Sequence, residues 1–393
     1  MLRKIFNFKE YNLKHYNIRA MLAAFLLSFI GLTIIKEVQK AEDMLYERQI
    51  FGIVLGIVVA LIISVIDYHF VCKFYILFYL VNLTLLVLTR TSLGHSYHDA
   101  RRWLIIPKIG QVQPSEFSKL LLILFFARLF DRFRKKIDKI YFLLLACILM
   151  GVPLLLILKQ PDLSTALALL AMFAGIVFLS GLSYKLIFPA LAVAIPACIG
   201  LWWYIQQDFQ FLLEPYQQRR ILALKHPELY PDLMWQQNNA AIAIRAGGLA
   251  GKFTGGSTQP LSCKILPAIE SDFIYTAVAE AYGFIGSCIV ISLMAFLVYR
   301  AFYVAFRAKD YLGMLVAGGI GCMLAFQTII NICVNTSIFP NTGIPFPFLS
   351  SGLSSLLGSY MMIGVLMNVS LQIREKEKED SLDLGSDRTD TIG

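Results

Sequence analysis

Asp272 stands where a polar segment containing Pro267 meets a long apolar run that begins at Phe273. Glu280 follows two helical turns later, roughly 80° round the helix from Asp272 at about 100° per residue. Acidic side chains at membrane depth cost several kcal/mol, so they tend to face a protein interior or a wet cavity and to mark a working site. Two interpretations of Asp272 stay open: a reactive carboxylate, or a helix N-cap favoured by the positive end of the helix dipole.

Cationic and acidic side chains also gather upstream of Asp272. Glu116 and Lys119 are spaced i,i+3 on one predicted helix face, and Arg101 and Arg102 lie just before that helix. The pair is either a structural ion pair between two spans or part of an ionic network that positions Asp272. The arginines either grip a pyrophosphate through paired N–H donors or extend to the lipid headgroups. A second basic motif, YQQRRILALK, adds Arg219 and Arg220.

Other polar motifs carry weaker signals. Asp162 in QPDLSTAL either caps the following helix or contacts substrate. The glycine-rich stretch Gly247–Gly256 is either a phosphate-binding nest or a mobile loop. Serines in LSSGLSSL suit hydrogen bonds between membrane helices: Ser350, Ser351, Ser354 and Ser355. A cavity that combines carboxylates, cations and such a loop suits an anionic, lipid-linked substrate, because a general base and a stabilised leaving pyrophosphate are both available.

The elements that position these residues are predicted to be membrane helices. The chain of 393 residues is 58% hydrophobic and 16% charged, which is typical of a polytopic membrane protein. Lipid offers no partner to a free backbone amide, so we expect an all-α fold. Ten transmembrane helices are predicted: Ala20–Ile35, Ile50–Ile66, Phe74–Thr89, Ser115–Phe130, Ile140–Leu158, Leu163–Leu182, Tyr184–Ile205, Phe273–Tyr299, Tyr311–Val334 and Leu349–Leu371.

The distribution of Lys and Arg predicts that both chain ends are cytoplasmic (N-in/C-in). The strongest signal is the basic loop RLFDRFRKKIDK after the fourth span. Residues 1–19 then form a cytoplasmic N-terminal segment, and residues 20–371 form the membrane domain. A large outer loop, 206–271, joins spans seven and eight, and 372–393 is expected to be a disordered cytoplasmic tail. The chemically suggestive motifs all fall at the outer side.

Several functional classes are disfavoured by composition. The net charge of +9 resides in loops, where it sets topology, and no soluble basic module is present to hold nucleic acid. Seven cysteines show no CxxC and predict no disulfide framework. His95 and His98 share a loop without metal-ligand spacing on a helix, so we expect no protein metal site there.

These motifs together resemble the SEDS family of bacterial cell-wall proteins, which includes RodA, FtsW and SpoVE. The resemblance rests on RRW, QPSEFSK, QPDLSTAL, YQQRRI, GGLAGK, SDFIY and NTGIPFPFLSSG, in the family's order. It implies a ten-helix protein of the bacterial plasma membrane that polymerises lipid II into β-1,4 glycan strands on the outer face, for cell shape, division or sporulation. A lipid-linked precursor flippase and a non-enzymatic scaffold for a transpeptidase remain alternatives.

By this resemblance Asp272 is the essential acidic residue, and Glu116 and Lys119 match the family's span-four pair. Asp272 would deprotonate the 4-hydroxyl of the acceptor sugar, which attacks the anomeric carbon of the donor with inversion. The leaving undecaprenyl pyrophosphate would be stabilised by arginines or by a divalent cation, Mg²⁺ or Mn²⁺. The expected substrate-binding residues are Arg101, Arg102, Gln113, Ser115, Asp162, Glu280, Arg219 and Arg220.

The resemblance also implies a partner, a class B penicillin-binding protein that acts as a single-span transpeptidase. Some motifs depart from the family pattern. LPE is replaced by LPA with Ala268, TDFIF by SDFIY, a glutamate pair by Glu280 alone, and SYGGSS by SSGLSS. The acidic residue itself is kept, so we expect activity, with a changed rim around the site.

Overall fold

The computed structural model describes residues 11–39, 44–92, 94–97, 100–106, 110–160, 162–207, 209–211, 213, 215–256 and 259–373. Most of the predicted N-terminal segment and of the predicted tail therefore lies outside the described residues. The first two residues assigned to the tail, Gln372 and Ile373, are described and are buried against the bundle.

Each of the ten predicted spans coincides with a helix. The helices are α2 Ile18–Val38, α3 Leu45–Val65, α5 Tyr75–Leu88, α6 Pro114–Arg132, α7 Ile140–Leu158, α8 Leu163–Leu179, α9 Tyr184–Ile205, α13 Ile274–Arg307, α14 Tyr311–Asn335 and α15 Leu353–Leu371. Within the described residues, seven are long and apolar enough to cross a membrane; α5 and α8 are shorter apolar helices. The protein is mostly helical, and the number of ten crossings stays a prediction.

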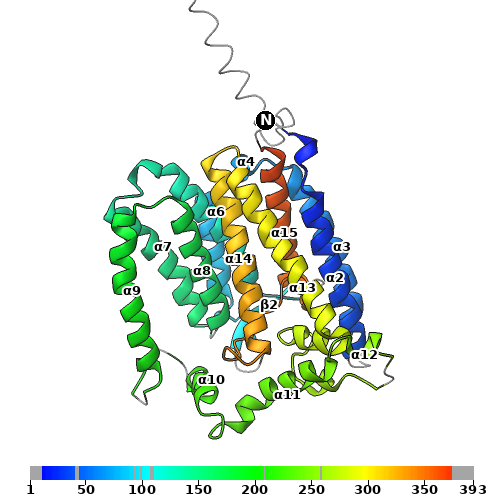
Figure 1. Cartoon of the computed structure of the whole chain (residues 1–393). Coiled ribbons are helices and arrows are strands. Elements are labelled where there is room, and N and C mark those ends of the chain that lie inside the picture. Colours follow the sequence, from blue (N-terminus) through cyan, green and yellow to red (C-terminus); the bar gives the residue numbers. More distant parts are fainter. Residues whose placement is uncertain are drawn as a thin grey trace, which may run out of the picture.

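Helices α14 and α15 lie at the centre of the bundle (Figure 1). Helix α15 packs mainly on α3, and α14 packs on α13 and α8. Most residues of α15 and α14 are consequently buried. Helix α9 stands at the edge of the bundle, where none of its described side chains is buried. The polar residues at the ends of α6, α8 and α14 thus lie within a close-packed core.

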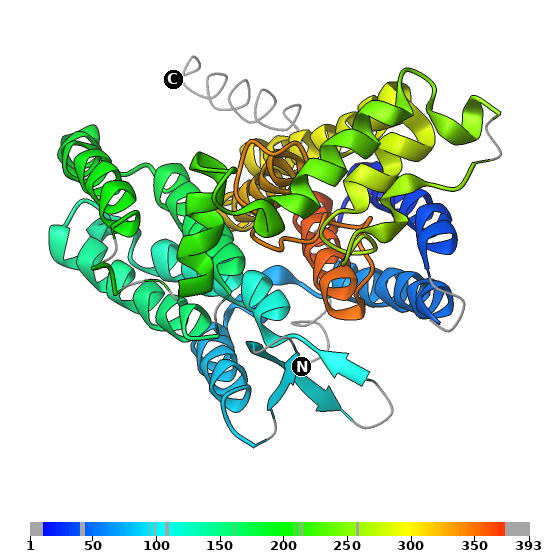
Figure 2. The same cartoon turned by 90° about the horizontal axis from the view of Figure 1, so that it is seen from below.

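The long connection 206–271 is largely helical. It contains α10 Pro215–Lys225, α11 Pro231–Gly247, the short α12 Gly251–Thr254 and the 3₁₀ helix η3 Ser262–Ile265. These helices lie across the end of the bundle opposite the short helix α4, Tyr68–Cys72 (Figures 1 and 2). They cover the start of α13 and place the YQQRRI motif over that end of the core.

A small sheet was not predicted, so the expectation of an all-helical chain is wrong between α5 and α6. Strands β1 Gly94–Tyr97, β2 Ala100–Ile106 and β3 Gly110–Val112 form an antiparallel sheet in the order β1-β2-β3. The sheet projects from the side of the bundle (Figure 2). The RRW motif lies on β2, which pairs with β1 on one edge and with β3 on the other. Leu104 of β2, for example, lies opposite Gly94 of β1 and Val112 of β3.

Helix α13 is broken at Gly283, which has φ 66° and ψ −161°. At the break, two backbone N–H groups of α13 lose their acceptors within the helix. Backbone oxygens of the loop before α12 accept from them instead. The N–H of Phe284 donates to Gly248 O at 2.9 Å, and that of Ile285 donates to Leu249 O at 3.2 Å. A Cβ on Gly251 would lie 2.4 Å from Gly283 N, so both glycines are needed for this approach. The glycine-rich stretch is therefore docked on α13, which excludes the mobile-loop interpretation.

Candidate active site

The main chain of Asp272 is fixed by residues from α14. Asp272 lies in a turn just before α13, and its N–H donates to Ala268 O at 3.0 Å. Its own carbonyl oxygen accepts from the side-chain amides of Asn331, at 2.9 Å, and Asn335, at 3.0 Å. Ala268 has a positive φ of 57°, a conformation that few non-glycine residues adopt. The carboxylate is thus carried by a turn held from two sides.

Capping of α13 is supplied by Asn335 rather than by Asp272. The N-cap position is Phe273, and its side chain makes no capping bond. Asn335 Oδ1 instead accepts from the N–H of Thr276 at 3.1 Å and from its hydroxyl at 2.7 Å. A capping bond satisfies one of the orphan N–H groups in the first turn. The cap interpretation of Asp272 is therefore replaced by a cap from the neighbouring helix.

The Asp272 carboxylate is partly buried under the loop that joins α14 to α15. A Cβ on Gly343, which has φ +73°, would lie 3.1 Å from Asp272 Oδ2. Burial raises the pKa of Asp272 to about 6, although Ser271, Arg220 and Arg102 act in the opposite direction. A carboxylate with this pKa takes up and releases a proton near neutral pH.

Serines of the SSGLSS motif hold the turn that carries Asp272 in place. Ser350 donates from its hydroxyl to Ser271 O at 2.6 Å and accepts from Phe346 N–H at 2.7 Å. The N–H of Ser351 donates to Glu270 O at 2.8 Å. These bonds were predicted to join membrane helices, but they instead lock the α14–α15 loop onto the turn before α13.

Two arginines from separate elements, β2 and α10, lie near Asp272. Arg102 in β2 donates from Nε to Gln160 O at 3.0 Å, and Arg220 in α10 donates to Asn341 O at 3.0 Å. Both are close enough to lower the pKa of Asp272. The structure thus brings together three of the predicted residues. Arg219 is exposed, and the side chain of Arg101 lies outside the described atoms.

Glu116 and Lys119 form a buried ion pair in the first half of α6. Lys119 Nζ lies 2.7 Å from Glu116 Oε2, and the two side chains are 3% and 4% exposed. The i,i+3 spacing predicted this contact. Loss of either partner would leave the other charge buried without compensation, which is strongly destabilising.

Gln113, Ser115 and Asp162 form one network between the starts of α6 and α8. Asp162 caps α8 by accepting from Thr165 N–H at 3.1 Å. Its other oxygen accepts from Gln113 Nε2 at 3.2 Å and from Ser115 at 3.3 Å. The cap prediction for Asp162 is confirmed. Two residues after Asp162, Ser164 donates to Thr342 O, which connects this network to the loop over Asp272.

Glu280 is fully buried and holds the connection 206–271 on α13. Its Oε1 lies 2.6 Å from Lys252 Nζ and accepts from Ser262 N–H at 2.7 Å. Its Oε2 accepts from Cys263 N–H at 2.9 Å. These contacts give Glu280 an anchoring role, and substrate binding by this residue stays a prediction.

Asn331, Asn335 and Gly343 were missed by the sequence analysis. Asn331 and Asn335 are spaced i,i+4 inside the apolar run of α14, and such polar residues in a membrane span usually mark a packed or working face. That spacing was a usable signal. Among the described residues, no group of three or more His, Cys, Asp or Glu side chains could hold a metal ion.

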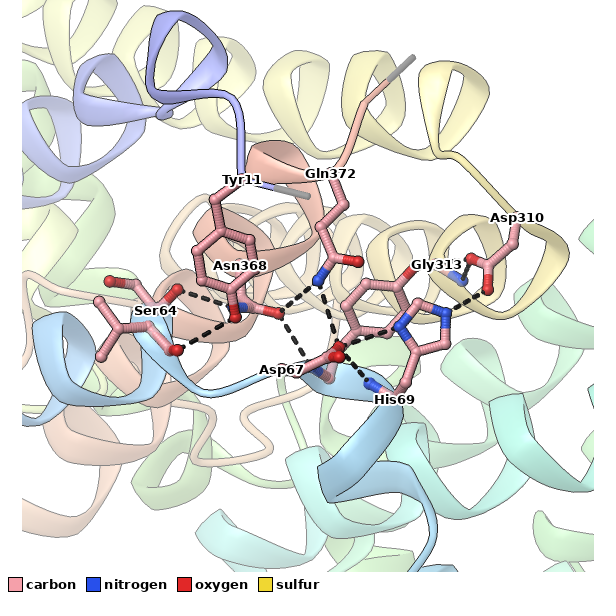
Figure 3. A network of polar contacts seen from close by, with 10 residues as sticks. Tyr11, Ser64, Asp67, His69, Asp310, Gly313, Asn368 and Gln372 are labelled. Carbon is pink, nitrogen blue, oxygen red and sulfur yellow. Dashed lines mark hydrogen bonds and ion pairs between the residues drawn. The ribbon is translucent and has the colours of Figure 1, made fainter. Parts of the chain in front are cut away.

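A second polar cluster (Figure 3), also missed, lies around α4, at the opposite end of the bundle (Figure 1). His69 lies between two carboxylates, with Nδ1 2.9 Å from Asp67 and Nε2 2.6 Å from Asp310. Asp67 also accepts from Gln372, and Asn368 donates to Tyr11 and to Ser64 O. This cluster ties the chain before α2, the α3–α4 turn, the start of α14 and the end of α15.

Comparison with known proteins identifies similar chains over nearly the whole length. The family described as cell cycle protein, FtsW/RodA/SpoVE, matches residues 15–375. A probable peptidoglycan glycosyltransferase FtsW of Trichlorobacter lovleyi is 33% identical over 384 residues, covering 95% of this chain and 97% of that protein. The peptidoglycan glycosyltransferase MrdB of Escherichia coli K12 is 31% identical, covering 82% and 85%.

Two solved structures share the fold. A chain from a peptidoglycan synthase complex superposes with a TM-score of 0.74 at 24% identity, covering 90% of this chain and 97% of that one. The crystal structure of the rod shape determining protein RodA of Thermus thermophilus gives 0.65 at 22% identity, covering 92% and 98%.

Proposed function

This chain belongs to the FtsW/RodA/SpoVE family of cell cycle proteins, and we propose that Asp272 is the general base of its glycosyl transfer. Relatives that share about a third of their residues over most of both chains are peptidoglycan glycosyltransferases. The chain is accordingly a membrane glycosyltransferase that polymerises peptidoglycan in cell-wall synthesis. What remains to be assigned is the chemistry of individual side chains.

The carboxylate of Asp272, which caps no helix, carries the proposal. Because Asn335 caps α13, the Asp272 carboxylate is left out of the capping bonds, and its pKa of about 6 leaves it ionised at neutral pH. We propose that it removes the proton from the 4-hydroxyl of the acceptor sugar of lipid II. The freed oxygen then attacks the anomeric carbon of a second lipid-linked sugar, and the bond to pyrophosphate breaks with inversion.

Arg102 and Arg220 are proposed to stabilise the leaving pyrophosphate. Each donates one N–H group to a backbone carbonyl, which fixes the position of the guanidinium near Asp272. Charge that develops on the leaving oxygen is stabilised by such preorganised cations.

The test is polymerisation of purified lipid II by Asp272→Asn. Asparagine keeps the size of the side chain but cannot take the proton, so we expect at least a ~100-fold loss of rate. Folding should persist: the raised pKa means that the ionised carboxylate is disfavoured in the folded state, so the melting temperature at neutral pH should not fall. Asp232→Asn, an exposed change in α11, is the matched control.

The parent enzyme should also gain rate as pH rises through about 6 and then level off, because the base must be ionised. Polymerisation by Asp272→Asn at the parental rate would remove Asp272 from the mechanism. A variant that binds its transpeptidase and supports growth without polymerising would favour the scaffold alternative. Transport of lipid II by Asp272→Asn without polymerisation would favour the flippase alternative.

We propose that both chain ends are cytoplasmic and that the Asp272 end of the bundle faces outward from the plasma membrane. In a variant without native cysteines, Gln259→Cys should react with an impermeant thiol reagent in intact cells. Lys135→Cys, at the other end of the bundle, should react only after lysis. The reverse labelling would overturn the orientation.

A class B penicillin-binding protein is the proposed partner. The solved peptidoglycan synthase complex that shares this fold coordinates polymerisation and crosslinking. The partner's single membrane helix would pack on the lipid-facing side of the bundle, with its outer domain over 206–271. Co-purification from membranes should recover such a transpeptidase; full activity and consistent recovery of none would count against an obligate complex.

A further inference from the structure

A polar cavity of about 610 Å³ lies at the end of the bundle opposite Asp272. Three turns surround it: the α6–α7 turn with Arg134 and Asp138, the end of α8 with Ser180, and the α13–α14 turn with Lys309. In Figure 1 this is the end that carries α4. The cavity is therefore separate from the proposed catalytic site.

Arg134 lines the cavity, and its guanidinium group packs on an aromatic ring. Its guanidinium carbon lies 4.3 Å from the centre of the Tyr311 ring, and the Tyr311 hydroxyl donates to Ser180 O at 2.7 Å. Among the described residues Arg134 has no hydrogen bond or ion pair with a carboxylate. A guanidinium stacked by its face keeps its N–H edge available for bidentate bonds to a phosphate. Lys309 adds a second cation to the wall.

The acidic residues of the wall already have donors. Asp310 accepts from His69 at 2.6 Å, from the Tyr68 hydroxyl at 2.6 Å and from Gly313 N–H (Figure 3). Asp138 accepts from the N–H of Ser183 at 2.8 Å. These bonds hold both carboxylates in place and compensate part of their charge.

An apolar rim accompanies these polar groups. Phe306 near the end of α13 lines the cavity and is 73% exposed. Side chains at this level of a membrane helix lie where headgroups meet acyl chains. A ligand that matches both features has a phosphate and a hydrocarbon portion. Basic residues at such positions attract the phosphates of membrane lipids.

We propose that this cavity binds the phosphate group of a membrane glycerophospholipid, with Arg134 and Lys309 on the phosphate and Phe306 against the acyl chain. The phosphate is the shared chemistry of lipid and soluble phosphate esters. The apolar rim selects the lipid.

The test uses the full-length protein, purified in detergent and delipidated, with dioleoyl-phosphatidylglycerol as the probe and native mass spectrometry as the readout. One retained lipid is expected, with affinity at least roughly 10-fold weaker in Arg134→Gln, the scale of one lost charge-assisted bidentate contact. Lys309→Gln should weaken binding as well. Lys135→Gln is the matched control, because it removes the same charge one residue away from the cavity wall.

Two further probes separate the sources of affinity. Dioleoylglycerol has the acyl chains without the phosphate and should not be retained. Glycerol 3-phosphate has the phosphate without the chains and should bind much more weakly than the lipid. Equal loss in Lys135→Gln and Arg134→Gln would reduce the effect to general surface charge and overturn the site. Glycerol 3-phosphate binding as tightly as the lipid would overturn its assignment to a lipid.

Discussion

Asn335 joins the turn that carries Asp272 to the helix that follows it. Its side-chain amide donates to the carbonyl oxygen of Asp272 at 3.0 Å, while its side-chain oxygen accepts from Thr276 N–H at 3.1 Å. One fully buried residue of α14 thus fixes the main chain of Asp272 and caps α13. The orientation of the carboxylate therefore depends on the packing of α13 against α14.

Removal of this link should reduce both stability and rate. Asn335→Ala leaves the Thr276 N–H without its cap, and a buried unsatisfied donor costs about 1–3 kcal/mol. We expect a lower melting temperature and slower lipid II polymerisation. Asn239→Ala is the control, because that amide bonds to Trp235 O in its own helix. Parental activity in Asn335→Ala would show that the turn is positioned by other contacts.

A methyl group beside the carboxylate should also reduce the rate. Gly343→Ala would place a Cβ 3.1 Å from Asp272 Oδ2 and would be strained by the φ of +73°. Gly256→Ala has a similar φ, +71°, but meets nothing within 4 Å, so it reports the backbone strain alone. Both variants should lose a similar amount of stability, on the order of 1 kcal/mol. A drop in polymerisation is expected in Gly343→Ala only, and equal rates would exclude crowding of the base.

The Glu116–Lys119 pair gives a test with three variants. Glu116→Gln or Lys119→Met alone leaves one buried charge without its partner, which costs about 3–5 kcal/mol. The double variant removes both charges and should recover much of the melting temperature. If the pair belongs to the catalytic network, polymerisation stays low in the double variant. Recovery of both quantities would identify the pair as a structural brace.

The His69 cluster should make stability depend on pH. Burial acts to lower the pKa of His69, but its bonds to Asp310 and Asp67 outweigh burial and raise it from 6.5 to about 9. Protonated His69 therefore stabilises the fold fully below pH 6.5, and the contribution is lost as pH rises through about 9. Burial acts to raise the pKa of Asp310, yet the bonds from His69 and Tyr68 hold it at about 2.

The Asp310 contribution is thus present above pH 3.8 and is lost as pH falls through about 2. Melting temperatures of the parent and of His69→Gln, measured from pH 6 to 10, check the His69 part. The parent should lose stability over that range relative to the variant. Parallel profiles for the two proteins would contradict a protonated His69.

The helices were predictable because their apolar runs are long and uninterrupted. Tyr184–Ile205 and Ile140–Leu158 agree with the structure at both ends. The sheet around β2 was not predictable in the same way, because its strands are short and are stabilised by pairing between separate segments. The break at Gly283 was missed. The N–H groups just after it donate to backbone oxygens of Gly248 and Leu249, which belong to a separate segment earlier in the chain.

The candidate site was predicted where side chains act within one motif. The i,i+3 pair Glu116–Lys119 and the cap by Asp162 follow from local spacing. Contacts between distant segments gave no local signal. Asn335 reaches Asp272 across 63 residues, and His69 reaches Asp310 across 241. Those pairs required the packing of the whole bundle.

The break in α13 has a mechanical consequence. The segment before Gly283 is enclosed by protein, whereas Phe284 and Ile285 just after it are 64% and 52% exposed. A membrane helix adapts to the thickness of the bilayer by tilting or bending. We therefore expect a change in tilt of the long, lipid-facing segment to be taken up where the helix is interrupted and held by the loop before α12, rather than transmitted along a rigid rod. The turn that carries Asp272 would then be insulated from variation in bilayer thickness.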